Sequence, residues 1–297
     1  MEITASLVKE LRDKTGAGMM DCKKALTATD GNIALAIDWL REKGISKAEK
    51  KASRIAAEGV AKIMIDGNKA TLFELNCETD FVANNEKYAI LVEKVGQMIE
   101  HSTATNTEQA LEVVVNGKTL KEVLLEAVST IGENLTLRNV QIIQKTDAQV
   151  FGAYSHMGGK IVSLTVLNGT DSETAKDVAM HVAAMSPRFL SSADISAEEL
   201  AHERDVLTKT ALNENAESDK PKPEAIVLKM IEGRLNKNMK EICLVNQAFV
   251  KNPDLSVEAY VKSKGGSIAS FKRLAVGEGI EKKEENFAQE VLAAQGK

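Results

Sequence analysis

A β-hairpin followed by an amphipathic helix is the pattern that most limits how this sequence can fold. Residues 60–65 and 70–77 flank Asp66–Gly67–Asn68–Lys69, which is a strong signal for a hairpin turn. The second segment alternates apolar and polar residues, as a half-buried strand does. A helix to about His101 follows. Its apolar side chains recur at helical spacing and are Tyr88, Leu91, Val92, Val95, Met98 and Ile99.

The same order of elements recurs in the second half of the chain. Residues 152–156 and 161–167 flank the turn Met157–Lys160, and an amphipathic helix over residues 175–185 ends before Pro187. A repeated strand, turn, strand and helix predicts an α+β fold with a duplicated core and two small antiparallel sheets. The remaining strands of the two sheets are expected at residues 135–143 and 268–276.

The N-terminal residues 4–44 predict three short helices, which end at Gly16, near Leu26 and at Gly44. A basic, helical linker follows as far as Arg54. Two methionines, Met19 and Met20, lie at the start of the second helix. They are either part of the small core or an adaptable surface for docking, since methionine suits both settings.

The second core unit is interrupted before its last strand by two charge-rich helices, at residues 198–212 and 224–239. Their pattern predicts an antiparallel helical hairpin, with a seam formed by Leu228, Ile231, Leu235 and Met239. A C-terminal amphipathic helix is expected around Phe287 and Val291. The predicted domains are an N-terminal domain with its linker (1–54), the first core half (55–147), the first part of the second core half (148–190), the inserted hairpin and its return (191–260), the last strand of the second core half (261–281) and a C-terminal helical module (282–297).

The stretch Cys77–Asn85, which we call the corner, joins the first hairpin to its helix and contains a phenylalanine, Phe81. A phenylalanine flanked by capping residues either folds back as a hydrophobic staple or stands out to bind a partner. The second copy has Thr170–Asp171–Ser172 at the equivalent place, so the aromatic side chain is not repeated. This difference between the two copies favours partner binding over the staple, but both interpretations stay open.

Composition excludes several classes of protein. The net charge is −5 and only 4% of residues are aromatic, so the basic surface and stacking platforms typical of nucleic-acid binding are not expected. No apolar run approaches the roughly 20 residues needed to span a bilayer. Three widely separated cysteines indicate reduced thiols rather than a disulfide framework. The start of the chain lacks a signal-peptide pattern, and we expect a cytoplasmic protein that contacts neither nucleic acid nor membrane.

The sequence offers little for covalent chemistry. It contains no Walker-type phosphate loop, and its four histidines lack the spacing of a metal site, so neither a cofactor nor a metal is expected. Cys77 is a conceivable thiol nucleophile, with His156 or His181 recruited through space. However, Glu78 and Asp80 beside it would raise the thiol pKa. We therefore predict no catalytic residue.

Several motifs resemble those of bacterial elongation factor Ts. The segments Arg12–Leu26 and Thr79–Asp80–Phe81–Val82–Ala83 are similar to the two most specific signatures of this family. Three further segments fall in the family's order, and the resemblance covers essentially the whole chain. They are Ile131–Asn134, Ala179–Ala184 and Val276–Lys282.

The resemblance implies a ubiquitin-associated-like N-terminal domain and an exchange factor that releases GDP from elongation factor Tu. It implies that Thr79, Asp80, Phe81 and Val82 displace Mg²⁺ from the partner. It also implies that the partner is bound by Arg12, Met19, Met20, His156 and Val291. Both the GDP-bound and the nucleotide-free partner would be recognised. The alternatives are a binding scaffold that self-associates through the helical hairpin, and a thiol hydrolase at Cys77.

Overall fold

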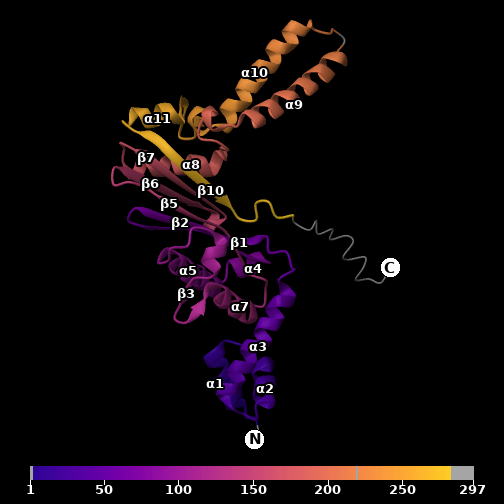
Figure 1. The fold of residues 1–297 in the computed structure, drawn as a ribbon, viewed down its shortest axis with the longest axis vertical. Coiled ribbons are helices and arrows are strands. Elements are labelled where there is room, and N and C mark those ends of the chain that lie inside the picture. The colour runs from indigo at the N-terminus through magenta and orange to yellow at the C-terminus, as the bar shows by residue number, and fades with distance from the viewer. Residues whose placement is uncertain (1–2, 219, 282–297) are drawn as a thin grey trace. The chain divides into compact units, whose positions relative to one another are not determined.

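The computed structural model, which describes residues 3–218 and 220–281, has an α+β fold (Figure 1). The chain divides into two units. Among the described residues, unit 1 comprises 3–144, 157–160 and 274–281, and unit 2 comprises 145–156, 161–218 and 220–273. The chain therefore passes between the units several times rather than forming two consecutive domains.

Three helices open unit 1: α1 (Ala5–Thr15), α2 (Met19–Ala28) and α3 (Ile33–Lys51). The Thr4 hydroxyl caps α1 by accepting a hydrogen bond from Leu7 N at 3.3 Å. Gly16 ends this helix in the left-handed conformation, with φ +66°. Together the three helices bury a small cluster of side chains, namely Val8, Leu11, Cys22, Ala25, Leu26 and Ala36.

The expected end of the third helix at Gly44 is wrong, because α3 continues through the basic linker to Lys51. At Gly44, α3 passes close to α7 (Leu120–Ile131). A Cβ at this position would lie 2.5 Å from Ser129 Oγ. The glycine therefore permits a close approach between two helices and does not stop the one that contains it.

The first sheet has the strand order β1 (Glu58–Asp66), β2 (Lys69–Cys77) and β5 (Thr136–Gln144), and both pairings are antiparallel. Asp66 pairs with Lys69, which confirms the predicted hairpin. Between β2 and β5 the chain forms α4 (Asp80–Ala83), α5 (Glu86–Glu100), α6 (Thr107–Leu111), β3 (Val114–Val115), β4 (Lys118–Thr119) and α7.

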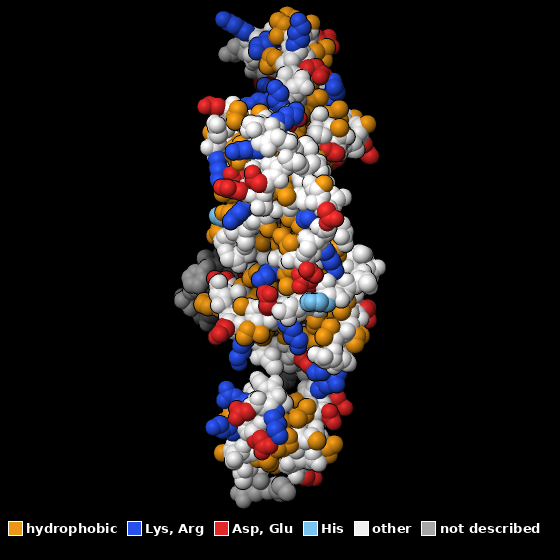
Figure 2. Space-filling view, turned by 90° about the vertical axis from the view of Figure 1, so that its left-hand side faces the viewer, with side chains coloured by type: hydrophobic (Ala, Val, Ile, Leu, Met, Phe, Trp, Pro, Cys, Tyr) orange, Lys and Arg blue, Asp and Glu red, His pale blue; other side chains and the backbone are white. Residues whose placement is uncertain are grey.

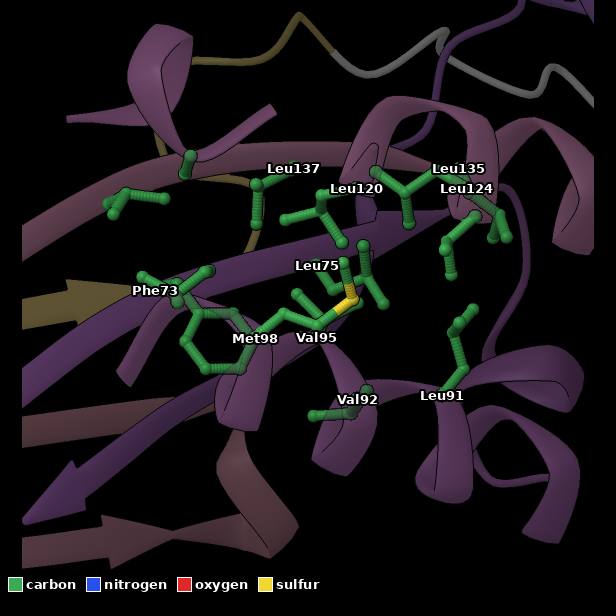
Figure 3. Close-up of a cluster of buried hydrophobic side chains, with 14 of the residues drawn as sticks. Phe73, Leu75, Leu91, Val92, Val95, Met98, Leu120, Leu124, Leu135 and Leu137 are labelled. Carbon is green, nitrogen blue, oxygen red and sulfur yellow. The ribbon is translucent and has the colours of Figure 1, made fainter. Parts of the chain in front are cut away.

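The core of the first sheet is formed by apolar side chains from its strands, α5 and α7 (Figure 3). Phe73 and Leu75 of β2 are fully buried, and the six predicted apolar residues of α5 are all buried. The expectation that β2 is half-buried is wrong, because its polar residues Glu74 and Asn76 are also fully buried. On this face of the strand, Glu74 accepts a hydrogen bond from Gly277 N, which belongs to a segment near the end of the described residues.

Unit 2 repeats this arrangement. Its sheet has the order β10 (Ser267–Ala275, the end of which belongs to unit 1), β7 (Ile161–Asn168) and β6 (Gln149–His156), and a short 3₁₀ helix, η1 (Met157–Gly159), forms the turn between β6 and β7. As in the first sheet, the second strand of a hairpin is central and a later strand completes the other edge. The helix α8 (Ser172–Met185) packs on β6, where a Cβ at Gly152 would lie 2.0 Å from the carbonyl carbon of Ala175.

The insertion forms the expected helical hairpin, with η2 (Ser192–Asp194) leading into α9 (Ala197–Ala216) and α10 (Glu224–Ile242) (Figure 1). Ile231 and Leu235 lie in its seam as predicted, and Met239 is half-buried. The prediction that Leu228 lies in the seam is wrong, since its side chain is 52% exposed and Val227 is buried instead. The return to the sheet contains η3 (Leu244–Asn246), β8 (Ala248–Phe249), β9 (Asn252–Ser256) and α11 (Val257–Ser263).

The predicted C-terminal helix around Phe287 and Val291 lies outside the described residues. Within residues 3–218 and 220–281, no helix combines the length and the apolar character needed to cross a membrane. On the face drawn in Figure 2, Lys and Arg side chains are interspersed with Asp and Glu side chains.

Candidate functional site

The corner Cys77–Asn85 presents Phe81 to solvent. β2 ends at Cys77, and Thr79 caps the single helical turn α4 by accepting a hydrogen bond from Val82 N at 3.3 Å. Ala83 is buried and Val82 packs against the core of the first sheet, whereas the side chain of Phe81 is 84% exposed. The hydrophobic-staple interpretation of Phe81 is therefore wrong. Such exposure of a large aromatic side chain fits a contact with another molecule.

The corner is also held from a distant part of the chain. Glu133, which follows α7, accepts hydrogen bonds from the backbone N–H groups of Glu78 and Thr79 and from the Thr79 hydroxyl. Sequence reasoning noted Glu133 only as part of the segment Ile131–Asn134 and gave it no role. The pairing joins positions 54 residues apart, so no local periodicity could have indicated it.

The N-terminal helices expose the side chains that the resemblance selects. Met19 and Met20 are 50% and 66% exposed at the start of α2, so the interpretation of both as core residues is wrong. Arg12 is exposed in the last turn of α1. The three side chains thus belong to one small helical module, and its core excludes both methionines.

The remaining predicted contact residues, His156 and Val291, do not belong to this helical module. His156 is exposed at the end of β6 in unit 2, where its ring stacks on Tyr154 at 6.2 Å between centroids. Tyr154 Oη lies 3.5 Å from His156 Nδ1. Val291 lies outside the described residues.

The geometry of Cys77 argues against a thiol nucleophile. The side chain is fully buried and its Sγ donates to the carbonyl oxygen of Thr79 at 3.2 Å. Burial raises the pKa of Cys77 to about 11, so the thiol is almost entirely protonated at neutral pH. In the part of the chain that the structure describes, no group of three or more His, Cys, Asp or Glu side chains is placed to hold a metal ion.

A comparison with models of protein families shows which family the chain belongs to. The model of the family described as elongation factor TS matches residues 78–278, about two thirds of the chain. The chain belongs to the elongation factor Ts family. This is a family of translation elongation factors that promote nucleotide exchange on elongation factor Tu. The matched residues include most of the corner and Glu133, whereas Arg12, Met19 and Met20 precede them.

Proposed function

We propose that this protein releases GDP from elongation factor Tu through a wedge formed by Asp80 and Phe81. The wedge enters the nucleotide-binding domain of the partner, with Thr79 and Val82 setting its direction, and disturbs the site that holds Mg²⁺ and the phosphates. Mg²⁺ requires near-ideal octahedral geometry and bridges the nucleotide to a few protein oxygens and waters. A small displacement of those oxygens therefore weakens nucleotide binding strongly, and GTP can then enter.

The exposure of Phe81 is the observation that carries this proposal. The side chain is 84% exposed although Thr79 caps α4 and the two residues that follow Phe81 in the same turn, Val82 and Ala83, pack on the core of the first sheet. A wedge needs bulk on a firm support and no reactive group. Burying a phenylalanine contributes about 1.5–3 kcal/mol, which corresponds to about a ten- to hundredfold change in an equilibrium constant.

The N-terminal helices supply the second contact in this proposal. Arg12, Met19 and Met20 form an exposed surface that binds the nucleotide domain of the partner and keeps the wedge in place. Methionine side chains adapt to the shape of a partner, and arginine is favoured in interfaces. His156 and Val291 are proposed as further contacts. We also propose that the N-terminal domain is ubiquitin-associated-like.

The exchange factor and the nucleotide are two ligands of elongation factor Tu, and the coupling between their binding is reciprocal. If the exchange factor weakens nucleotide binding by a given factor, bound nucleotide weakens binding of the exchange factor by the same factor. GTP, on entering the partner, therefore promotes dissociation of the exchange factor.

The test is the release of fluorescent GDP from purified elongation factor Tu under excess unlabelled nucleotide. We expect the wild-type protein to accelerate release and Phe81→Ala to lower the maximal rate about ten- to hundredfold, the factor that one buried phenylalanine supplies. Val114→Ala is the matched control, because Val114 is also an exposed apolar residue of unit 1, at 61%.

Equal acceleration by wild type and Phe81→Ala would remove Phe81 from the mechanism. No acceleration by wild type, with a partner that releases GDP normally when Mg²⁺ is chelated, would overturn the proposed function itself.

A further inference from the structure

The carboxylate of Glu133 is directed at the residues that immediately precede the wedge. Glu133 Oε2 accepts hydrogen bonds from Glu78 N at 2.9 Å and from Thr79 N at 3.0 Å, and Oε1 accepts one from Thr79 Oγ1 at 2.6 Å. Gly132 ends α7 in the left-handed conformation and turns the chain toward the corner. One side chain thus binds three donors on two consecutive residues.

We propose that Glu133 is the positioning residue of the wedge, an inference that rests on the proposed function of Phe81. The Thr79 hydroxyl donates a hydrogen bond to Glu133. The lone pairs of the Thr79 oxygen are therefore free to accept the hydrogen bond from Val82 N that caps α4. The carboxylate therefore fixes the rotation of the hydroxyl and, through it, the start of α4.

The corner depends on such an external support. α4 has only four residues, and a helix of this length has no stability of its own in water. Phe81 lies on the exposed side of α4 and makes no contribution to the core that would hold it. The direction of its side chain is set by the ends of the turn, and Glu133 holds the N-terminal end.

The residues on either side of Glu133 tie the same loop to the end of α3. Asn134 Nδ2 donates to the carbonyl oxygen of Arg54 at 2.8 Å, and Lys51 Nζ donates to that of Gly132 at 2.5 Å. In return, Glu78 Oε1 accepts from Asn134 N at 2.6 Å. The loop 132–134 is thus held on both sides, so the Glu133 carboxylate is a fixed support rather than a mobile surface charge.

The test is a set of variants in the GDP-release assay, together with amide hydrogen exchange measured on the full chain by NMR. Glu133→Ala removes all three hydrogen bonds. It should lower the maximal rate of release about three- to tenfold, the factor that one typical hydrogen bond supplies, because only part of the lost support is expressed in the rate. The protein concentration that gives half-maximal release should change less than twofold. The amides of Glu78 and Thr79 should exchange faster, because their acceptor is gone.

Glu133→Gln should restore most of the rate. The amide oxygen of glutamine can accept from both backbone N–H groups, and its Nε2 can donate to Thr79 Oγ1. Glu112→Ala, at an exposed carboxylate after α6, should behave as wild type in both measurements. The double variant Phe81→Ala/Glu133→Ala should be no slower than Phe81→Ala alone, since Glu133 acts through Phe81.

Two results would overturn the positioning role while leaving the wedge intact. One is a slow Phe81→Ala variant beside a Glu133→Ala variant with wild-type rate and wild-type amide exchange. The other is a Glu133→Ala loss that is equally large on the Phe81→Ala background, which would place the effect of Glu133 elsewhere. A Phe81→Ala variant with full rate would instead overturn the wedge, and the positioning role with it.

Discussion

Glu74 shows how a charged residue can be placed at the centre of a strand. Its carboxylate is fully buried and accepts hydrogen bonds from Asn76 Nδ2 at 2.6 Å, Asn139 Nδ2 at 2.8 Å and Gly277 N at 2.7 Å. Arg138 Nη1 lies 3.6 Å away. A buried carboxylate is tolerated only when it is paired and hydrogen-bonded in this way. The group therefore fixes the segment around Gly277 to the first sheet.

Gly277 and Gly279 have similar backbone conformations but different surroundings. Gly277 has φ +76°, and a Cβ there would lie 2.3 Å from the carbonyl oxygen of Ala57, whereas Gly279, with φ +77°, has open space around its Cβ position. Gly279→Ala should cost about 1–2 kcal/mol, from the left-handed conformation alone. Gly277→Ala should cost about 1–3 kcal/mol more, from the forced displacement of backbone. Urea unfolding of the two variants measures the difference, and equal losses would contradict it.

Elements with a strong internal period are those that the sequence predicts well. The apolar spacing of α5 and the turn residues between β1 and β2 are local signals, and both elements are found where they are expected. Gly44 is different, because the reason for a glycine there is a side chain of α7, Ser129. A glycine that permits close packing and one that ends a helix look alike in a sequence.

The candidate site also has one part that the sequence predicts and one part that depends on the fold. The motif around Phe81 is contiguous and was found from the sequence, but its exposure depends on how the neighbouring residues pack, and both interpretations of it were open. The role of Glu133 is seen only in the fold, because its three donors are on Glu78 and Thr79, 54 or 55 positions earlier in the sequence. The burial of Glu74 likewise depends on Gly277, 203 positions away.

His181 connects α8 to the return from the helical hairpin. It is fully buried, its Nδ1 accepts from Val250 N at 3.1 Å, and its Nε2 lies 2.9 Å from Gln247 Oε1. Because the Val250 N–H must donate, the ring is neutral with its proton on Nε2. Burial lowers the pKa of His181. A second proton would meet the Val250 N–H and break this connection.

The pH dependence of stability follows from that pKa. A histidine whose pKa is lowered by folding binds protons more readily in the unfolded chain, so its contribution to stability is lost as pH falls below about 6.5. We expect the urea midpoint of unit 2 to fall between pH 7 and pH 5. His181→Gln should be less stable at pH 7 but lose less over this interval, whereas His101→Gln, at an exposed histidine, should follow wild type. Parallel curves for wild type and His181→Gln would contradict the assignment.

The whole molecule contains separate hydrophobic cores. The core of the first sheet includes Leu75 and belongs to unit 1, and that of the second sheet includes Leu167 and belongs to unit 2. The chain crosses between the units at 144/145, 156/157, 160/161 and 273/274. Each unit buries its own apolar surface, which is the main stabilising term in folding. Separate cores predict separate local stabilities, as in other proteins that open in cooperative parts.

One leucine-to-alanine substitution in each core would test whether the two units have separate local stabilities. Leu75 and Leu167 are both fully buried, so Leu75→Ala and Leu167→Ala should each cost about 2–5 kcal/mol. Native-state amide exchange should show the loss of protection in unit 1 for Leu75→Ala and in unit 2 for Leu167→Ala, because a cavity weakens the cluster that contains it. The same loss in both units for either variant would mean that the chain unfolds as one cooperative body. In the expected case, Leu167→Ala leaves the protection of Glu78 and Thr79 unchanged, since the support of the wedge lies wholly in unit 1.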